Sequence, residues 1–203
     1  MYIPKSHDQN DRAAVLQLIR NEPFATLISV CDGRPVITHI PVNIECVDPE
    51  LVLGGHIASA NPQSATLNGA EVVICFRGPH AYVSPQWYTN QNRNVPTWNY
   101  AIVHCTGRAT VVEGAEKIEI VSRLVDAMEE GTQNPWSLAH TDDDYRAILM
   151  KKIVAFSMRV DCIEASFKLG QDHSAADRAG VASALRASAR QSDRDLAALM
   201  QDH

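Results

Sequence analysis

The spacing of apolar residues changes several times along the chain and predicts where helices and strands lie. In residues 8–21 apolar side chains recur three and four positions apart, which is the period of a helix, and Pro23 prevents its continuation. Residues 24–30 and 35–44 are instead rich in β-branched side chains, and they flank Asp32-Gly33, a pair typical of tight hairpin turns. The chain is therefore predicted to begin with a helix and a β-hairpin.

The same two patterns continue through the rest of the chain. Strands are predicted at 51–57, 71–77, 80–84, 101–113 and 153–163, with a break at Gly78-Pro79 and an exposed loop at 89–94. A helical turn is expected to open at Asn61-Pro62, and helices are predicted near 118–128, near 142–149 and after Ser174.

Short strands joined by hairpins, with helices between and after them, indicate a mainly β, α+β fold in which an antiparallel sheet closes into a barrel. Neither Gly-x-Gly-x-x-Gly nor Gly-x-x-x-x-Gly-Lys occurs, which argues against a Rossmann or P-loop nucleotide site. With 203 residues, the chain fits one barrel domain, which we place at 1–170, followed by a C-terminal helical tail at 171–203.

Composition excludes several classes of protein. An apolar content of 45% excludes intrinsic disorder, and the longest apolar run, Val72–Phe76, is far shorter than the about 20 residues that cross a bilayer. The first residues contain no apolar segment typical of a signal peptide, so we expect a cytoplasmic protein with no membrane partner. The five cysteines are widely spaced and odd in number, and we expect them to be reduced and mostly buried.

Residues 56–62 are the first candidate for binding chemistry. A strand that leads into a capped helix start presents backbone N–H groups, and Ser59 and Asn61 add side-chain donors, a combination that suits an anion or a phosphate. The alternative, which the pattern alone favours, is that Asn61 only caps the helix.

Aromatic and polar residues gather in segments 78–88 and 95–100, on either side of the exposed loop. Such aromatics could wall a flat heterocyclic ligand or fill a subunit interface, and an ordinary core edge is equally compatible with the pattern. Histidines lie on predicted strands at His39, His56, His80 and His104, where structural roles are favoured over a metal or haem site because no paired ligand spacing occurs. We predict no metal site and assign no catalytic residue.

Several longer motifs occur in order, namely Pro23-Phe24-Ala25-Thr26-Leu27, Gly55-His56-Ile57-Ala58 with Ala60-Asn61-Pro62, Gly78-Pro79-x-Ala81-Tyr82-Val83-Ser84-Pro85-x-Trp87-Tyr88, Val95-Pro96-Thr97-Trp98-Asn99-Tyr100 and Lys168-Leu169-x-Gln171. Together they resemble the PaiB family, also called FMN-binding negative transcriptional regulators, over nearly the whole chain. The resemblance implies a flavin-reductase-like split barrel that dimerises and holds FMN in a groove between its subunits.

The resemblance also implies which residues contact the cofactor. It puts His39, Ile40 and Pro41 beside the flavin, and His56, Ile57, Ala58, Ser59 and Asn61 at the phosphate. Around the ring, partly from the partner subunit, it puts Tyr82, Ser84, Trp87, Thr97, Trp98 and Asn99, with Lys168 and Gln171 approaching from the C-terminal segment. Two positions depart from the family pattern, because Ser59 stands where members often carry Arg and Asp172 stands where Asn is usual. We expect the lost positive charge and the added negative charge to weaken FMN binding.

The function inferred at this point is that of a homodimeric FMN flavoprotein of the PaiB type with a regulatory, transcription-related role. The alternatives are a flavin-dependent oxidoreductase that acts on a small molecule and a haem-binding split barrel. Direct DNA binding is compatible with a regulatory role, but the net charge of −6 does not favour it, since binding along DNA needs a basic surface.

Overall fold

The computed structural model describes residues 1–46, 48 and 50–201, and the chain forms two compact units. The barrel unit comprises residues 19–76 and 104–163, and the terminal unit comprises residues 1–18, 77–103 and 164–203. Each unit is therefore assembled from segments that lie far apart in the sequence.

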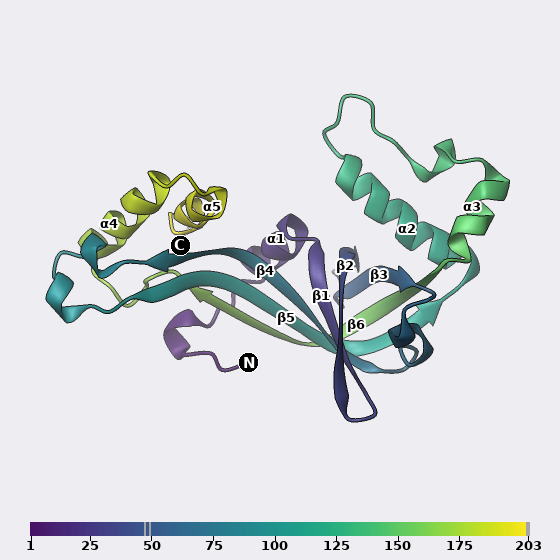
Figure 1. Cartoon of the computed structure of the whole chain (residues 1–203), viewed down its shortest axis with the longest axis horizontal. Helices are drawn as coiled ribbons and strands as arrows, with labels where there is room; N and C mark the ends of the chain where they lie inside the picture. The colour runs from purple at the N-terminus through teal and green to yellow at the C-terminus, as the bar shows by residue number, and fades with distance from the viewer. Residues whose placement is uncertain (47, 49, 202–203) are drawn as a thin grey trace. The chain divides into compact units, whose positions relative to one another are not determined.

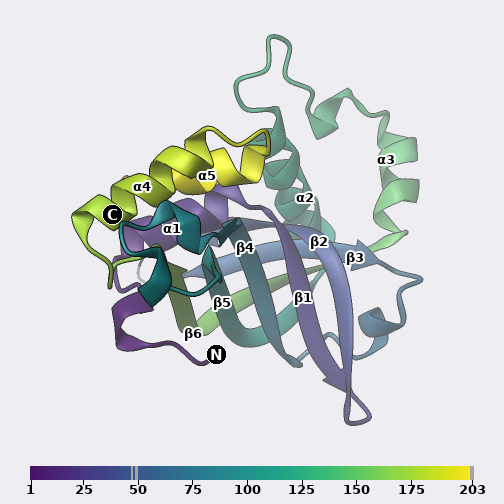
Figure 2. The same ribbon diagram turned by 60° about the vertical axis from the view of Figure 1, so that its left-hand side comes forward.

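Among the described residues, six strands form the sheet, and they pair in the order β1-β2-β3-β6-β5-β4 and close into a barrel. Their bounds are β1 Phe24–Cys31, β2 Arg34–Cys46, β3 Val52–Ala58, β4 Glu71–Val83, β5 Thr97–Val112 and β6 Ile153–Lys168. Figure 2 shows β1 and β2 as a hairpin, in which Cys31 pairs with Arg34 across a two-residue turn. Asp32 and Gly33 adopt φ angles of 51° and 72° there, as a tight turn requires. The predicted antiparallel barrel is confirmed.

The barrel core comes from strand residues that alternate between the two faces of the sheet. Leu27, Val42 and Ile74 are fully buried, whereas the residues on either side of each are partly exposed. Burial of one such aliphatic side chain contributes about 1.5–3 kcal/mol, so the inward positions hold the strands together.

Helix α2 (Gly114–Glu129) packs against β2 and β3 in the barrel unit. Its buried residues Ile120 and Leu124 form a cluster with Val112 and Ala155, so the helix predicted near 118–128 is confirmed and begins earlier, at Gly114. The other helical segments of this unit are shorter and comprise η2 (Pro62–Ala65), η5 (Leu138–His140) and α3 (Asp143–Met150).

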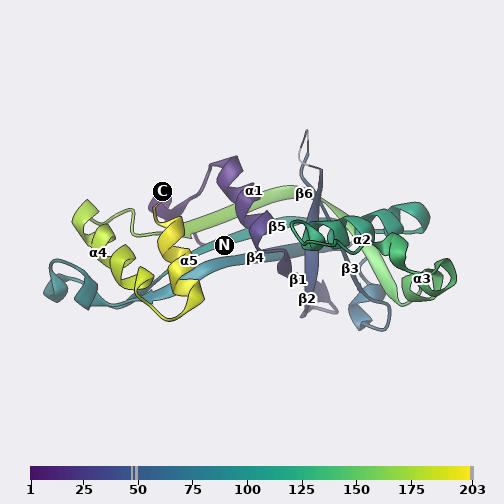
Figure 3. The same cartoon turned by 90° about the horizontal axis from the view of Figure 1, so that it is seen from above.

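The terminal unit combines both ends of the chain with parts of β4, β5 and β6. Its helical segments are η1 (Lys5–His7), most of α1 (Arg12–Asn21), η3 (Pro85–Trp87), η4 (Gln91–Arg93), α4 (Ala175–Arg186) and α5 (Gln191–Leu199). Helices α4 and α5 lie side by side (Figure 3). Ser174 caps α4 by accepting a hydrogen bond from the Asp177 backbone N–H, at the start that the sequence predicts.

Two predictions are wrong, one about a break in strand β4 and one about the burial of the cysteines. Strand β4 runs without a break through Gly78-Pro79, beside β5 (Figure 1). Its register with β1 ends at Cys75, so the proline lies where that side of the strand is no longer in register with a neighbour, a position that tolerates a missing N–H. The cysteines are expected to be mostly buried, but of those whose burial is described Cys105 is buried, Cys31 and Cys75 are partly exposed, and Cys162 is exposed.

No helix among the described residues has the length and apolar content that a bilayer crossing requires. The boundary between a barrel domain and a tail at residue 170 stays a prediction.

Candidate functional site

The outer face of the β1–β2 hairpin carries the first group of predicted site residues. His39 lies opposite Thr26 in the strand register, with its Nδ1 atom 3.1 Å from the Thr26 hydroxyl. Its ring centroid is 6.4 Å from that of Phe24, which is 71% exposed. Ile40 points the other way and is buried in the core. Of this group, His39 is therefore open to a ligand, while the Ile40 side chain is structural.

A hydrogen-bond network fixes the turn that follows β3. Asn61 caps η2 by accepting from the Gln63 backbone N–H at 2.9 Å, and its amide nitrogen donates to the Thr38 hydroxyl at 2.9 Å. Thr38 in turn donates to Gln63 Oε1 at 2.6 Å, and Gln63 Nε2 donates to the buried Ser29 hydroxyl at 2.8 Å. Gln63 is only 1% exposed. The Asn61 side chain thus serves the turn itself, as the cap interpretation expects.

The segment between β3 and η2 remains open to solvent. Ala58, Ser59 and Ala60 are exposed, whereas Ile57 is buried in the core. The Ser59 backbone N–H donates to the Lys152 carbonyl at 2.8 Å, and the Asn61 backbone N–H donates to the Ala58 carbonyl at 2.9 Å. The backbone of the turn is therefore held from both sides, while the Ser59 side chain faces solvent.

His56, on β3, has a different environment from the open turn. Its Nδ1 atom is buried and has no hydrogen-bond partner among the described residues. Burial lowers the pKa of His56, because the charged imidazolium loses its hydration. The ring is therefore held neutral and suits a structural role or a hydrogen bond to a ligand better than a charge contact with a phosphate.

In the terminal unit, three aromatic side chains of β4 and β5 form an exposed cluster. The Trp98 ring is stacked with that of His80 at a centroid distance of 6.4 Å, and it forms a T-shaped pair with the Tyr82 ring at a centroid distance of 6.2 Å. Trp98 is 51% exposed, so about half of its surface is accessible to a ligand. The sequence predicts Tyr82 and Trp98 in one site and a structural role for His80, and the structure brings all three together. We call these residues the Trp98 cluster.

The remaining predicted residues of this unit make local contacts. Ser84 caps η3 by accepting from the Gln86 backbone N–H at 3.3 Å, and Trp87 is half-buried. Lys168 Nζ donates to the Thr97 hydroxyl. Asn99 is buried, with its amide nitrogen 3.9 Å from the Met200 sulfur. Hydrogen bonds tie Gln171 to the backbone of Phe167 and Leu169, so its amide shapes the chain after β6.

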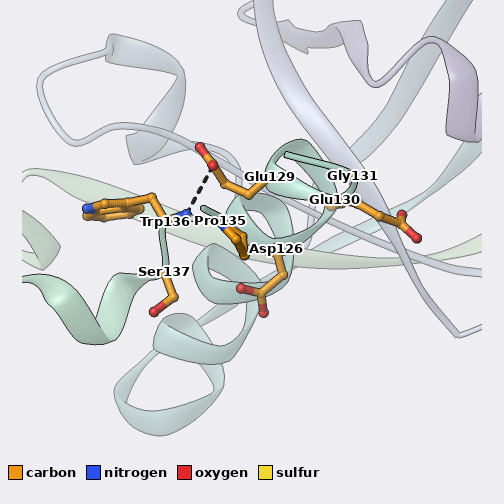
Figure 4. A pocket seen from close by; sticks show the side chains of 8 residues that line it. Asp126, Glu129, Glu130, Gly131, Pro135, Trp136 and Ser137 are labelled. Carbon is orange, nitrogen blue, oxygen red and sulfur yellow. Dashed lines mark hydrogen bonds between the residues drawn. The ribbon is translucent and has the colours of Figure 1, made fainter. Parts of the chain in front are cut away.

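A cavity at the end of α2 contains none of the predicted site residues. It has a volume of about 630 Å³ and is lined by Asp126, Glu129, Glu130, Trp136 and their neighbours (Figure 4). Glu129 accepts a hydrogen bond from the Trp136 backbone N–H at 3.0 Å, which closes the loop over the end of the helix. The three carboxylates would repel a phosphate, so this cavity does not suit an anionic ligand.

Neither a metal centre nor an activated nucleophile is evident in the part of the chain that the structure describes. No group of three or more His, Cys, Asp or Glu side chains is placed there to hold a metal ion. Burial raises the pKa of Cys105 to about 12, which keeps this thiol protonated at neutral pH. The open turn and the Trp98 cluster are both exposed to solvent, so a ligand can reach them.

Residues 1–162 match a protein family described as "Putative FMN-binding domain". The chain is 32% identical over 203 residues to the "Protease synthase and sporulation protein PAI 2" of Bacillus subtilis (strain 168), and the match covers 100% of this chain and 97% of that protein. The sequence motifs do not include Thr38, Gln63 or Lys152. Thr38 bonds to Gln63, and Lys152 bonds to Ser59. Because the partners in each pair lie far apart in the sequence, no local motif contains both.

Two solved structures share the fold. The FAD and haem binding protein from Mycobacterium smegmatis superposes with a TM-score of 0.64 at 18% identity, over 85% of this chain and 78% of that one. The flavocytochrome Anf3 from Azotobacter vinelandii gives a TM-score of 0.63 at 16% identity, over 83% of this chain and 73% of that one. At these identities the similarity is one of architecture.

Proposed function

Because this chain belongs to the PaiB family of FMN-binding split-barrel proteins, we propose that it is a homodimeric flavoprotein with a regulatory role connected with transcription. The observation that carries the proposal beyond family membership is the Trp98 cluster, an exposed aromatic surface of the kind that stacks on a flat heterocycle. The name of the Bacillus subtilis relative, "Protease synthase and sporulation protein PAI 2", refers to sporulation, which supports a regulatory role.

FMN is the cofactor of this chain, and the residues present fit its two ends. The open turn at 58–60 offers a hydroxyl on a rigid backbone, and residues 56–66 contain no acidic side chain that would repel a phosphate. We propose that this turn binds the phosphate, with His39 on the flavin side and with the Trp98 cluster of the partner subunit against the ring. When bound, FMN supplies hydride or electron transfer, while the protein supplies binding and orientation.

A matched pair of tryptophan variants tests the ring contact. Trp98 is 51% exposed and Trp136 is 44% exposed, but Trp136 borders the acidic cavity at the end of α2. We expect Trp98→Ala to weaken FMN binding about tenfold or more, as measured by quenching of flavin fluorescence, and Trp136→Ala to leave it unchanged. Equal affinity in both variants would contradict the assignment of the ring to the Trp98 cluster.

The dimer is supported by the outer face of the β1–β2 hairpin. Phe24 is 71% exposed and Ile37 is 57% exposed, and both project from the same side of the sheet. Large apolar side chains gathered on one sheet face are typical of an interaction surface. We expect sedimentation to give a dimer for the native protein and a monomer for Ile37→Glu, while Ile148→Glu, at an equally exposed position on α3, stays dimeric.

The regulatory role has an alternative in a flavin-dependent oxidoreductase, and transcript measurements separate the two. We expect a strain that lacks the gene to change its transcript profile, and Trp98→Ala to reproduce that change. We expect no retardation of DNA in a gel-shift assay at low salt, since the net charge of −6 opposes direct contact with a polyanion. An unchanged transcript profile would favour the oxidoreductase.

A further inference from the structure

Lys152 lies directly opposite Ser59 at the point where two strands of the barrel end. The register between β3 and β6 runs from Val52↔Arg159 to Ala58↔Ile153. Continued by one residue, it pairs Ser59 with Lys152, and the 2.8 Å hydrogen bond from the Ser59 N–H to the Lys152 carbonyl shows that the pairing extends this far.

This pairing puts the two side chains on the same face. In antiparallel strands the Cβ atoms of directly opposite residues are about 4.5–5.5 Å apart and project to one side of the sheet. Both residues are exposed, so the flexible lysine stem starts beside the serine hydroxyl and is free to extend over the turn.

The surroundings leave the lysine charge uncompensated. Neither 56–66 nor 149–154, the two segments that meet here, contains an Asp or a Glu. Within the described part of the chain Lys152 forms no ion pair, whereas Arg123, Arg146 and Arg159 each bind a carboxylate. In a chain with a net charge of −6, this is a local site of positive charge next to a hydroxyl and a fixed turn.

We infer that Lys152 and Ser59 together bind the phosphate of the flavin, and that this pair makes the protein select FMN over riboflavin, which has the same ring but no phosphate. The inference rests on the proposed position of the phosphate at the turn. The ammonium group and the hydroxyl each donate a charge-assisted hydrogen bond to the anionic phosphate oxygens, which riboflavin lacks.

Two lysine variants and two ligands test the inference. We expect Lys152→Ala to raise the Kd for FMN about tenfold or more and to leave the Kd for riboflavin unchanged. Lys151→Ala is the matched control, because it removes the same charge from the neighbouring exposed residue, and we expect it to change neither Kd. Thermal unfolding of each variant checks that the fold is retained.

The outcomes separate this inference from the proposed function. If Lys152→Ala leaves the FMN affinity unchanged, or weakens FMN and riboflavin by the same factor, the phosphate role of Lys152 is wrong while the flavoprotein stands. If Lys151→Ala and Lys152→Ala weaken FMN equally, a diffuse charge rather than the register partner is responsible, and the inference is again overturned. If the native protein binds neither flavin, the proposed function fails at that step, before any variant is compared.

Discussion

Arg123 on α2 donates a hydrogen bond to Glu45 on β2 at 2.5 Å, although the carboxylate that it reaches is almost enclosed by the fold. The Glu45 side chain is 10% exposed, and an added Cβ at Gly54 would lie 2.4 Å from its Oε1 atom. A larger residue at position 54 would require the Glu45 side chain to move. The other guanidinium nitrogen of Arg123 binds Glu119, so one arginine links the helix to the strand.

Glu45 is expected to make stability depend on pH. Burial raises the pKa of Glu45 above its ordinary value of 4.5, even though Arg123 acts in the opposite direction. The folded state therefore binds the proton more tightly than the unfolded state, and this residue's contribution to the free energy of unfolding increases as the pH falls through the raised pKa towards 4.5. We expect Glu45→Gln to remove that contribution, as measured by urea unfolding from neutral pH to about pH 4. Glu71→Gln, at an exposed position on β4 away from Arg123, is the control and should keep the pH profile of the native protein.

Gln63 is expected to be essential for the stability of the turn after β3. Gln63→Leu would leave the Ser29 and Thr38 hydroxyls without their buried partner, at a cost of about 1–3 kcal/mol in the free energy of unfolding. Gln86→Leu, at an exposed position, should cost far less. Chemical denaturation measures both, and equal stability of the two variants would show that the network contributes nothing.

Gly180 permits close packing of α4 against η3. A Cβ at this position would lie 2.4 Å from the Trp87 carbonyl oxygen, which cannot move without shifting the backbone. Gly to Ala within a helix ordinarily stabilises it by about 0.5–1 kcal/mol, but here we expect a net loss of about 1–3 kcal/mol from overpacking. Ala179→Gly, at the exposed neighbouring position, should cost only the helix propensity of about 1 kcal/mol. A stabilised Gly180→Ala variant in thermal unfolding would contradict the close contact.

His7 is expected to limit stability on the acidic side of neutrality. Both ring nitrogens are buried without a hydrogen-bond partner among the described residues, and burial lowers the pKa of His7 below its ordinary value of 6.5. The unfolded state therefore takes up the proton first, so the stability that neutral His7 provides is complete above pH 6.5 and is lost as the pH falls towards the lowered pKa. His7→Phe should flatten the stability profile in this range. A profile identical to that of the native protein would show that His7 does not titrate as proposed.

Much of the fold follows from local sequence. The Asp32-Gly33 turn, the alternating core residues such as Leu27, the Ser174 cap and the stripe on α2 are each set by neighbours in the chain, and the structure confirms them. The break expected at Gly78-Pro79 is wrong, because pairing with a neighbouring strand outweighs the turn preference of two residues. The cytoplasmic location and the role of each predicted site residue stay predictions.

The sequence by itself determined the kind of protein, since its ordered motifs identify the family and with it the flavin cofactor. Tertiary structure decided which polar side chains are available to that cofactor. Asn61 and Gln171 carry the amide groups that a binding site uses, yet both are engaged in hydrogen bonds within the fold. In the sequence, Ser59 in place of an arginine predicts a weakened phosphate site. The β3–β6 register, however, brings the positively charged Lys152 beside Ser59. The physical reason is that strand pairing joins residues far apart in the chain, and no local pattern records which residue will lie opposite another.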